Sequence, residues 1–175
     1  MRTHNLADLY DLPLVDWSSI EARLDQGFTQ APDTGGPNRH TCWLTTLDAD
    51  GGPHTTGVGA VWLDGSWWFE TGRGTRKGRN VERDPRCSLA VALHEFDLVV
   101  RGTAAVVTDP ATVARLAETW APDWPCRVDE SGIALTAEYS APSAGKPPWH
   151  VYRITSVSAV VLSIVGPGGA TRFDF

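Results

Sequence analysis

The chain has 175 residues, a formal net charge of −6 at pH 7 and a hydrophobic content of 42%. This length suits one domain with a real core rather than two. An acidic chain with a single basic segment argues against a nucleic-acid partner. No apolar run reaches the roughly 20 residues of a membrane-spanning helix, and no signal-peptide pattern opens the chain. We therefore expect no membrane span and a cytoplasmic protein.

The N-terminal part predicts little regular structure. Residues 1–15 show no period and are expected to form an extended arm. Ser18 and Glu21 have the spacing of a capping box, which predicts a short helix directly after them. We assign residues 1–40 to this arm and helix, and residues 41–175 to a single domain.

The rest of the chain alternates strand-like runs with turn signals, and Asp64-Gly65 is its strongest hairpin signal. Asp109-Pro110 predicts the start of a helix. Residues 121–147 predict a loop of uncertain order. Many antiparallel strands interrupted by helices favour a small barrel over a sandwich. The predicted strands cover residues 41–47, 54–63, 66–71, 86–93, 98–108, 149–165 and 171–175.

A basic segment follows the third predicted strand. A glycine-rich turn leads into a short helix, with Thr75 as its N-cap and Asp84-Pro85 as its stop. Arg76 and Lys77 fall in the first helical turn, where the helix dipole disfavours cations. A bound anion would remove this conflict, so the segment predicts a phosphate cradle. A solvated basic helix is the alternative interpretation.

Four motifs resemble, in this order, those of the pyridoxamine 5′-phosphate oxidase-like split-barrel flavoproteins. They are the D-A-D-G-G-P turn at 48–53, Phe69-x-Thr71, T-R-K-x-x-N-V-x-x-D-P-R at 75–86, and G-T-A at 102–104. The resemblance implies a mainly β fold, a split barrel of six to seven antiparallel strands with a few peripheral helices. It further implies an oxidoreductase that forms a homodimer, with flavin or deazaflavin sites at the interface and a small-molecule substrate.

The resemblance also implies which residues hold the cofactor, and it assigns no catalytic side chain and no metal ligand. The Arg and Lys that the oxidases place on the second strand are Thr56 and Val61 here, and the C-terminal Arg-Leu-x-Pro is missing, so pyridoxamine oxidase activity is not expected. The predicted cofactor residues are His54, Thr55, Thr56, Gly57 and Val58 along the ring, Thr71, Thr75, Arg76, Lys77 and Arg79 at the tail, and Trp149 as a ring that crosses to the partner.

Arg76, Arg79 and Arg83 recur at helical spacing and could follow a long anionic tail. This favours the deazaflavin coenzyme F420 over FMN. The expected function is hydride transfer to an unsaturated, aromatic or quinone-like molecule, in which the cofactor does the chemistry. A non-catalytic flavin- or haem-binding carrier or sensor of the same fold is the alternative. His150 is either a proton donor or a structural histidine.

Overall fold

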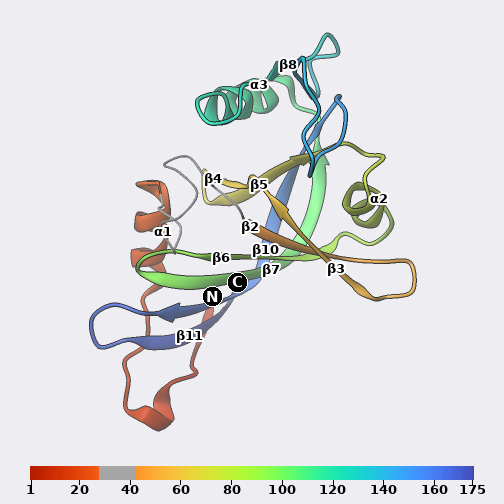
Figure 1. Ribbon diagram of the computed structural model, residues 1–175. Coiled ribbons are helices and arrows are strands. Elements are labelled where there is room, and N and C mark those ends of the chain that lie inside the picture. Colours follow the sequence, from red (N-terminus) through yellow and green to blue (C-terminus); the bar gives the residue numbers. More distant parts are fainter. Residues whose placement is uncertain (28–41) are drawn as a thin grey trace.

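The computed structural model describes residues 1–27 and 42–175 (Figure 1). Over these ranges the chain forms a nine-stranded sheet, a two-stranded sheet and three α-helices, which confirms the mainly β fold class. The helices are α1 (Trp17–Asp25), α2 (Arg76–Arg83) and α3 (Pro110–Trp120), with a 3₁₀ turn at Asp8–Tyr10. The strands are β1 (Arg2–Asn5), β2 (Cys42–Leu47), β3 (Pro53–Val58), β4 (Val61–Leu63), β5 (Ser66–Thr71), β6 (Arg86–Ala92), β7 (Phe96–Val107), β8 (Arg127–Val128), β9 (Leu135–Thr136), β10 (His150–Ser163) and β11 (Gly169–Asp174).

The long strand β10 organises the main sheet. Its first half pairs antiparallel with β5 on one edge and with β7 on the other. Its second half keeps β7 but pairs with β11 in place of β5. The pairing with β7 shifts register between Ser156 and Ser158, and such a bulge bends a strand. β5 and β11 therefore diverge from one shared neighbour, as expected for a split barrel.

The described part of the chain has more strands than the six or seven predicted. The second predicted strand is interrupted at Gly59, so that it gives β3 and β4, and β4 pairs with β5. The predicted N-terminal arm contains β1, which pairs with β11. The capping-box prediction is wrong, because the N-cap of α1 is Asp16, whose carboxylate accepts from the Ser18 backbone N–H at 3.2 Å. The proposed boundary at residue 40, and Thr41, lie outside the described residues.

β5 separates two hydrophobic cores, because its successive side chains point to opposite sides. Trp67 and Phe69 face the barrel interior, where Phe69 stacks on Tyr152 with ring centroids 5.0 Å apart. Trp68 faces the second core, which lies beneath α3 and contains Trp149. Both faces of β5 are covered, and every residue of the strand is buried.

The second core is the part of the fold that positions the candidate site. α3 lies beside it, with Asp109 as N-cap and Pro110 at the first turn, as predicted. The predicted loop 121–147 contains β8 and β9 and returns over the core through a turn that ends at Gly145. No helix within 1–27 and 42–175 is both long and apolar enough to cross a membrane.

Candidate functional site

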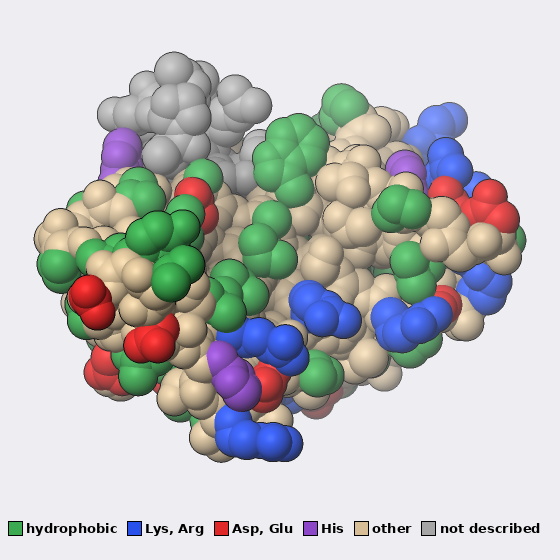
Figure 2. Space-filling model, turned by 90° about the horizontal axis from the view of Figure 1, so that it is seen from below, with side chains coloured by type: hydrophobic (Ala, Val, Ile, Leu, Met, Phe, Trp, Pro, Cys, Tyr) green, Lys and Arg blue, Asp and Glu red, His purple; other side chains and the backbone are tan. Residues whose placement is uncertain are grey.

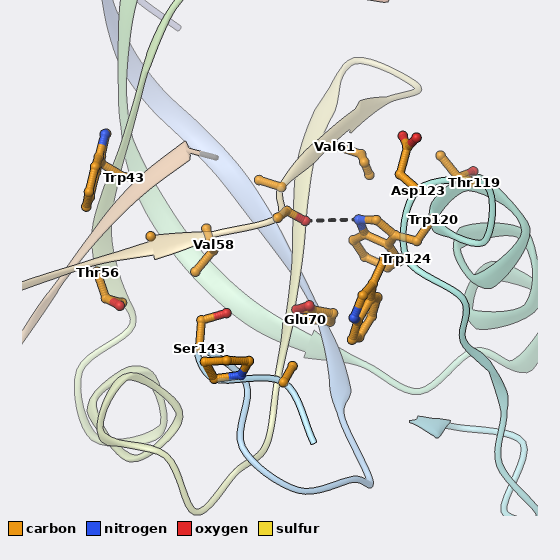
Figure 3. Close-up of a pocket in the computed structure, with 15 residues that line it drawn as sticks. Trp43, Thr56, Val58, Val61, Glu70, Thr119, Trp120, Asp123, Trp124 and Ser143 are labelled. Atoms are coloured by element: carbon orange, nitrogen blue, oxygen red, sulfur yellow. Dashed lines mark hydrogen bonds between the residues drawn. The ribbon is translucent and has the colours of Figure 1, made fainter. Parts of the chain in front are cut away.

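A pocket of about 610 Å³ lies between the end of β3, the C-terminal end of α3 and the segment 141–143 (Figure 3). Its walls come from parts of the chain that are far apart in sequence. Trp43 and residues 56–58 line the pocket from β2 and β3, and Glu70, Thr119 and Trp120 line it from β5 and α3. This size is within the range of small-molecule and cofactor sites.

The first wall is the break between β3 and β4. Thr56, Gly57 and Val58 line the pocket from β3, and the chain continues through Gly59. The Gly59 carbonyl accepts a hydrogen bond of 2.9 Å from Nε1 of Trp120, drawn as the dashed line in Figure 3. This bond ties the broken strand to the end of α3 and fixes the width of the pocket between them.

Tryptophan rings supply much of the remaining wall. Trp43, on β2, is 54% exposed, whereas Trp120, on α3, is 5% exposed. Trp124 follows α3, and its ring centroid lies 4.7 Å from that of the fully buried Trp149. Wide apolar rings around one cavity suit a flat aromatic ligand, because stacked and edge-to-face ring contacts are both favourable.

One acidic side chain lies in this apolar wall. Glu70 is on the same face of β5 as Trp68 and is only 6% exposed. Burial disfavours the charged carboxylate and raises the pKa of Glu70 to about 8, although the nearby Lys77 ammonium opposes the shift. Burial in turn lowers the pKa of Lys77, with Glu70 opposing.

The glycine turn and the start of α2, where a phosphate cradle was predicted, make several contacts within the chain. Thr75 caps α2 by accepting from the Gly78 backbone N–H at 3.2 Å, and its hydroxyl donates to the Gly72 carbonyl at 2.8 Å. The Thr71 hydroxyl lies 2.9 Å from that of Thr75. Lys77, predicted to be a ligand of the cofactor phosphate, is 3% exposed.

Carbonyl oxygens of the turn before Gly145 take the place expected for an anion. The Gly72 N–H donates to the Ala144 carbonyl at 3.0 Å, and the Lys77 ammonium donates to the Ser143 carbonyl. Carbonyl oxygens carry partial negative charge, so they relieve the conflict between Lys77 and the helix dipole. The cation that was predicted to hold a phosphate therefore holds a peptide segment in this structure.

The other cations of the basic segment lie on the surface of α2. Arg76 pairs with Asp48, with 2.9 Å between Nε and Oδ1, and this guanidinium holds the pKa of the Asp48 carboxyl below its usual value. Arg79 donates to the Gly74 carbonyl. Arg83 donates to the Leu47 carbonyl. These side chains remain exposed and can reach a ligand in solvent.

The structure thus divides the predicted site residues into groups. Thr56, Gly57 and Val58 line the pocket, whereas His54 and Thr55 lie further back on β3 and do not. Trp149 is fully buried among its own chain's rings, which contradicts the expectation that it crosses to a partner. The cradle residues Thr71, Thr75 and Lys77 lie behind the segment 141–145, and Arg76 and Arg79 lie outside it.

Sequence reasoning missed Glu70, Trp120 and Ser143 as pocket residues. Side chains alternate between the two faces of a strand, so Glu70 could have been placed on the same face of β5 as Trp68. Trp120 was not named as a pocket residue, because only the start of its helix at Asp109-Pro110 had a clear local signal. Ser143 had no local signal, since its contact with Lys77 joins residues 66 positions apart.

Comparison with known proteins places the chain in a family. Residues 29–143 match the family model described as pyridoxamine 5′-phosphate oxidase. A pyridoxine/pyridoxamine 5′-phosphate oxidase from Paraburkholderia phymatum is 31% identical over 174 residues, which cover 85% of this chain and 82% of that protein.

Two solved structures share the fold at lower identity. PhzG from Burkholderia lata 383, in complex with tetrahydrophenazine-1-carboxylic acid, has a TM-score of 0.60 at 16% identity and covers 95% of this chain and 90% of its own. A putative pyridoxamine 5′-phosphate oxidase from Listeria innocua has a TM-score of 0.55 at 18% identity, and the match covers 82% of this chain and 95% of that protein. The chain belongs to the pyridoxamine 5′-phosphate oxidase family of split-barrel proteins.

Proposed function

We propose that this protein is an oxidoreductase that binds the ring of a deazaflavin or flavin in the tryptophan-lined pocket and reduces a flat unsaturated or quinone-like molecule. The observation that carries the proposal is the pocket itself. Thr56, Gly57 and Val58, the segment expected along the ring, line it together with Trp43 and Trp120. When bound, the cofactor supplies the hydride.

The residues present fit the ring of such a cofactor better than its phosphate. The walls are broad, apolar and aromatic, and the volume accommodates a fused ring system. Gly57 and Val58 line the pocket, so their backbone N–H and C=O groups are available beside the proposed ring position. In contrast, Lys77 and the Gly72 N–H are engaged by the segment 141–145, so a phosphate enters the cradle only when these carbonyls leave it.

The exposed face of α2 supports coenzyme F420 over FMN. Arg76 and Arg79 lie on the surface, where Arg76 pairs with the Asp48 carboxylate and Arg79 donates to the Gly74 carbonyl. A tail with several carboxylates can exchange with such surface partners, since exposed ion pairs are worth only about 0–1 kcal/mol. FMN has a single phosphate and depends more on the buried cradle.

A turnover assay tests this proposal. Reduced coenzyme F420 and reduced FMN are each mixed with menadione, with and without the protein, and reoxidation of the cofactor is followed in the visible spectrum under anaerobic conditions. We expect protein-dependent reoxidation, faster with the deazaflavin. Saturable binding of either cofactor without any rate increase would favour the carrier or sensor role instead.

We also propose that the protein is a homodimer. Trp43, Ala90, Val99 and Val160 stand directly opposite one another across β2, β6, β7 and β10, so they form one row on the same sheet face. Trp43, Val99 and Val160 are 54%, 39% and 36% exposed. Figure 2 shows hydrophobic and basic side chains exposed together on the face seen from below. Exposed apolar rows of this kind mark association surfaces.

Light scattering after size exclusion tests the dimer. We expect twice the chain mass for the wild-type protein and a monomer for Val99→Glu, because Val99 stands between Ala90 and Val160 in the row and a charge there cannot be buried without a partner. Arg127→Glu, on the short sheet away from this row, is the control and should stay dimeric. A wild-type monomer at micromolar concentration would contradict the proposal.

A further inference from the structure

Glu70 occupies a position where a carboxyl group is costly to place. Trp68 precedes it on the same face of β5, and the strand is buried on both faces. The side chain lies in the pocket wall opposite Val58 and Val61, near Trp120 and Trp124 (Figure 3). The Lys77 ammonium and the Glu70 backbone N–H favour the charged carboxylate, but burial outweighs both, so the retention of a carboxyl group in this wall calls for a role.

The charged and titratable groups around Glu70 come from three directions. Lys77 approaches from α2, and its ammonium donates to the Ser143 carbonyl. Cys126 and Tyr139 approach from the segment after α3, and burial raises the pKa of both, so both are neutral at pH 7. Asp123 lines the pocket at the end of α3. Burial outweighs the Lys77 ammonium and raises the pKa of Glu70 to about 8, so the protonated form of Glu70 predominates at neutral pH.

A protonated carboxyl in this place is a hydrogen-bond donor at the edge of an aromatic slot. Its O–H can be satisfied by an oxygen of a ligand that lies between the rings. An anionic ligand edge is unsuitable, because the loss of its hydration in this apolar wall costs more than one hydrogen bond returns. A hydrocarbon edge leaves the donor without a partner. A neutral carbonyl oxygen meets both requirements.

We infer that Glu70 is the specificity-determining residue of the pocket, and that its carboxylic acid donates a hydrogen bond to a carbonyl oxygen on the edge of a flat aromatic ligand. The inference rests on the proposed function only in placing the ligand in this pocket. It names the ligand class as neutral ring carbonyl compounds, which include quinones and the ring system of flavins.

A matched pair of probes separates the hydrogen bond from the shape of the slot. Menadione carries two ring carbonyls, and 2-methylnaphthalene is the same bicyclic hydrocarbon without them. Binding of each is measured by quenching of tryptophan fluorescence or by equilibrium dialysis, on the wild-type protein, Glu70→Gln and Glu70→Ala. Riboflavin, which has the flavin ring and no phosphate, is the third probe.

Glu70→Ala should weaken menadione binding about fivefold at about pH 6.5, within the usual range for a neutral hydrogen bond. Its affinity for 2-methylnaphthalene should stay equal or rise. Glu70→Gln keeps a donor in its amide and should bind menadione within about twofold of wild type. Equal losses for both probes in Glu70→Ala would overturn the inference, because they would show a change of pocket shape only.

The pH dependence provides a second readout. The pKa of Glu70 is near 8, so wild-type affinity for menadione should fall as the pH rises from about 6.5 to about 9.5, because the carboxylate no longer donates. Glu70→Gln should show a flat profile over the same range. A wild-type affinity that is constant or rises with pH would overturn the inference, as would the absence of wild-type menadione binding.

The experiment distinguishes this inference from the proposed function. Glu70-dependent menadione binding without turnover of reduced FMN or coenzyme F420 would keep the inference and reject the oxidoreductase. Turnover of a reduced cofactor, together with menadione binding that is the same in wild type and in the Glu70 variants, would keep the oxidoreductase and reject the inference. Thermal melts of both variants show whether they fold. If Glu70→Ala does not fold, the affinity of Glu70→Gln and the pH profile of the wild-type protein still test the inference.

Discussion

Gly78→Ala is expected to destabilise the protein by about 2 kcal/mol or more, the cost of forcing an extra methyl group into a well-packed place. A Cβ at Gly78 would lie 2.6 Å from the Gly72 carbonyl oxygen and 2.9 Å from that of Arg73. Both are backbone atoms, so no flexible side chain can move aside. The helix propensity of alanine would return only about 1 kcal/mol, which is less than the clash costs.

The measurement is urea unfolding followed by circular dichroism, with Gly74→Ala as the matched control. Gly74 stands in the same turn, and a Cβ there would meet no atom within 4 Å. We expect the control to remain within about 0.5 kcal/mol of wild type, as for most surface substitutions. Equal stabilities of Gly78→Ala and wild type would show that α2 does not pack on the glycine turn as described.

Trp120→Ala is expected to cost about 3–5 kcal/mol, the range for truncation of a buried tryptophan or phenylalanine. The ring is 5% exposed in the second core, and the substitution also leaves the Gly59 carbonyl without the 2.9 Å hydrogen bond that it accepts from Nε1. The break between β3 and β4 loses its tie to α3, so the pocket should lose its shape together with its stability.

Trp43→Ala is the contrasting change on the opposite wall. Trp43 is 54% exposed within one chain, so its loss should alter the stability of the folded chain by no more than about 0.5 kcal/mol, apart from its share of the proposed dimer surface. It should nevertheless weaken riboflavin binding several-fold, since a ring–ring contact contributes about 0.5–1.5 kcal/mol. Thermal melts and fluorescence titrations of both variants separate the two roles. A stable Trp120→Ala, or a Trp43→Ala that binds riboflavin like wild type, would contradict this assignment.

Local patterns predicted much of the fold. The caps of α2 and α3 at Thr75 and Asp109, and the stop at Asp84, lie where short-range side-chain chemistry put them. The hairpin at Asp64-Gly65 also joins the strands expected of it. Such features depend on neighbours within about four residues, and the sequence displays them directly.

The sequence displayed less where a distant segment decides the contacts. Lys77 was predicted to hold a phosphate, because its position in the first helical turn disfavours a cation. In the structure its ammonium donates to the carbonyl of Ser143, 66 positions away, a contact that no local pattern displays. Trp149 was expected at an interface, but the rings around it in the second core bury it completely.

The candidate site was predicted in part. The β3 segment at Thr56–Val58 was named from the family resemblance and does line the pocket. The opposite wall could not be named, because α3 and the segment 141–143 reach β3 only through tertiary packing. The side chain with the most distinctive chemistry, Glu70, was hidden in a strand that was read only for its aromatic residues.

The central claim is that the tryptophan-lined pocket binds the cofactor ring, and a direct titration tests it. Oxidised coenzyme F420, FMN and riboflavin are added to the wild-type protein and to Trp43→Ala, and quenching of tryptophan fluorescence is recorded. The account predicts saturable quenching of the wild type, tightest with coenzyme F420, and weaker binding of every ligand by Trp43→Ala. Quenching that does not saturate, or binding that is unchanged in Trp43→Ala, would contradict it.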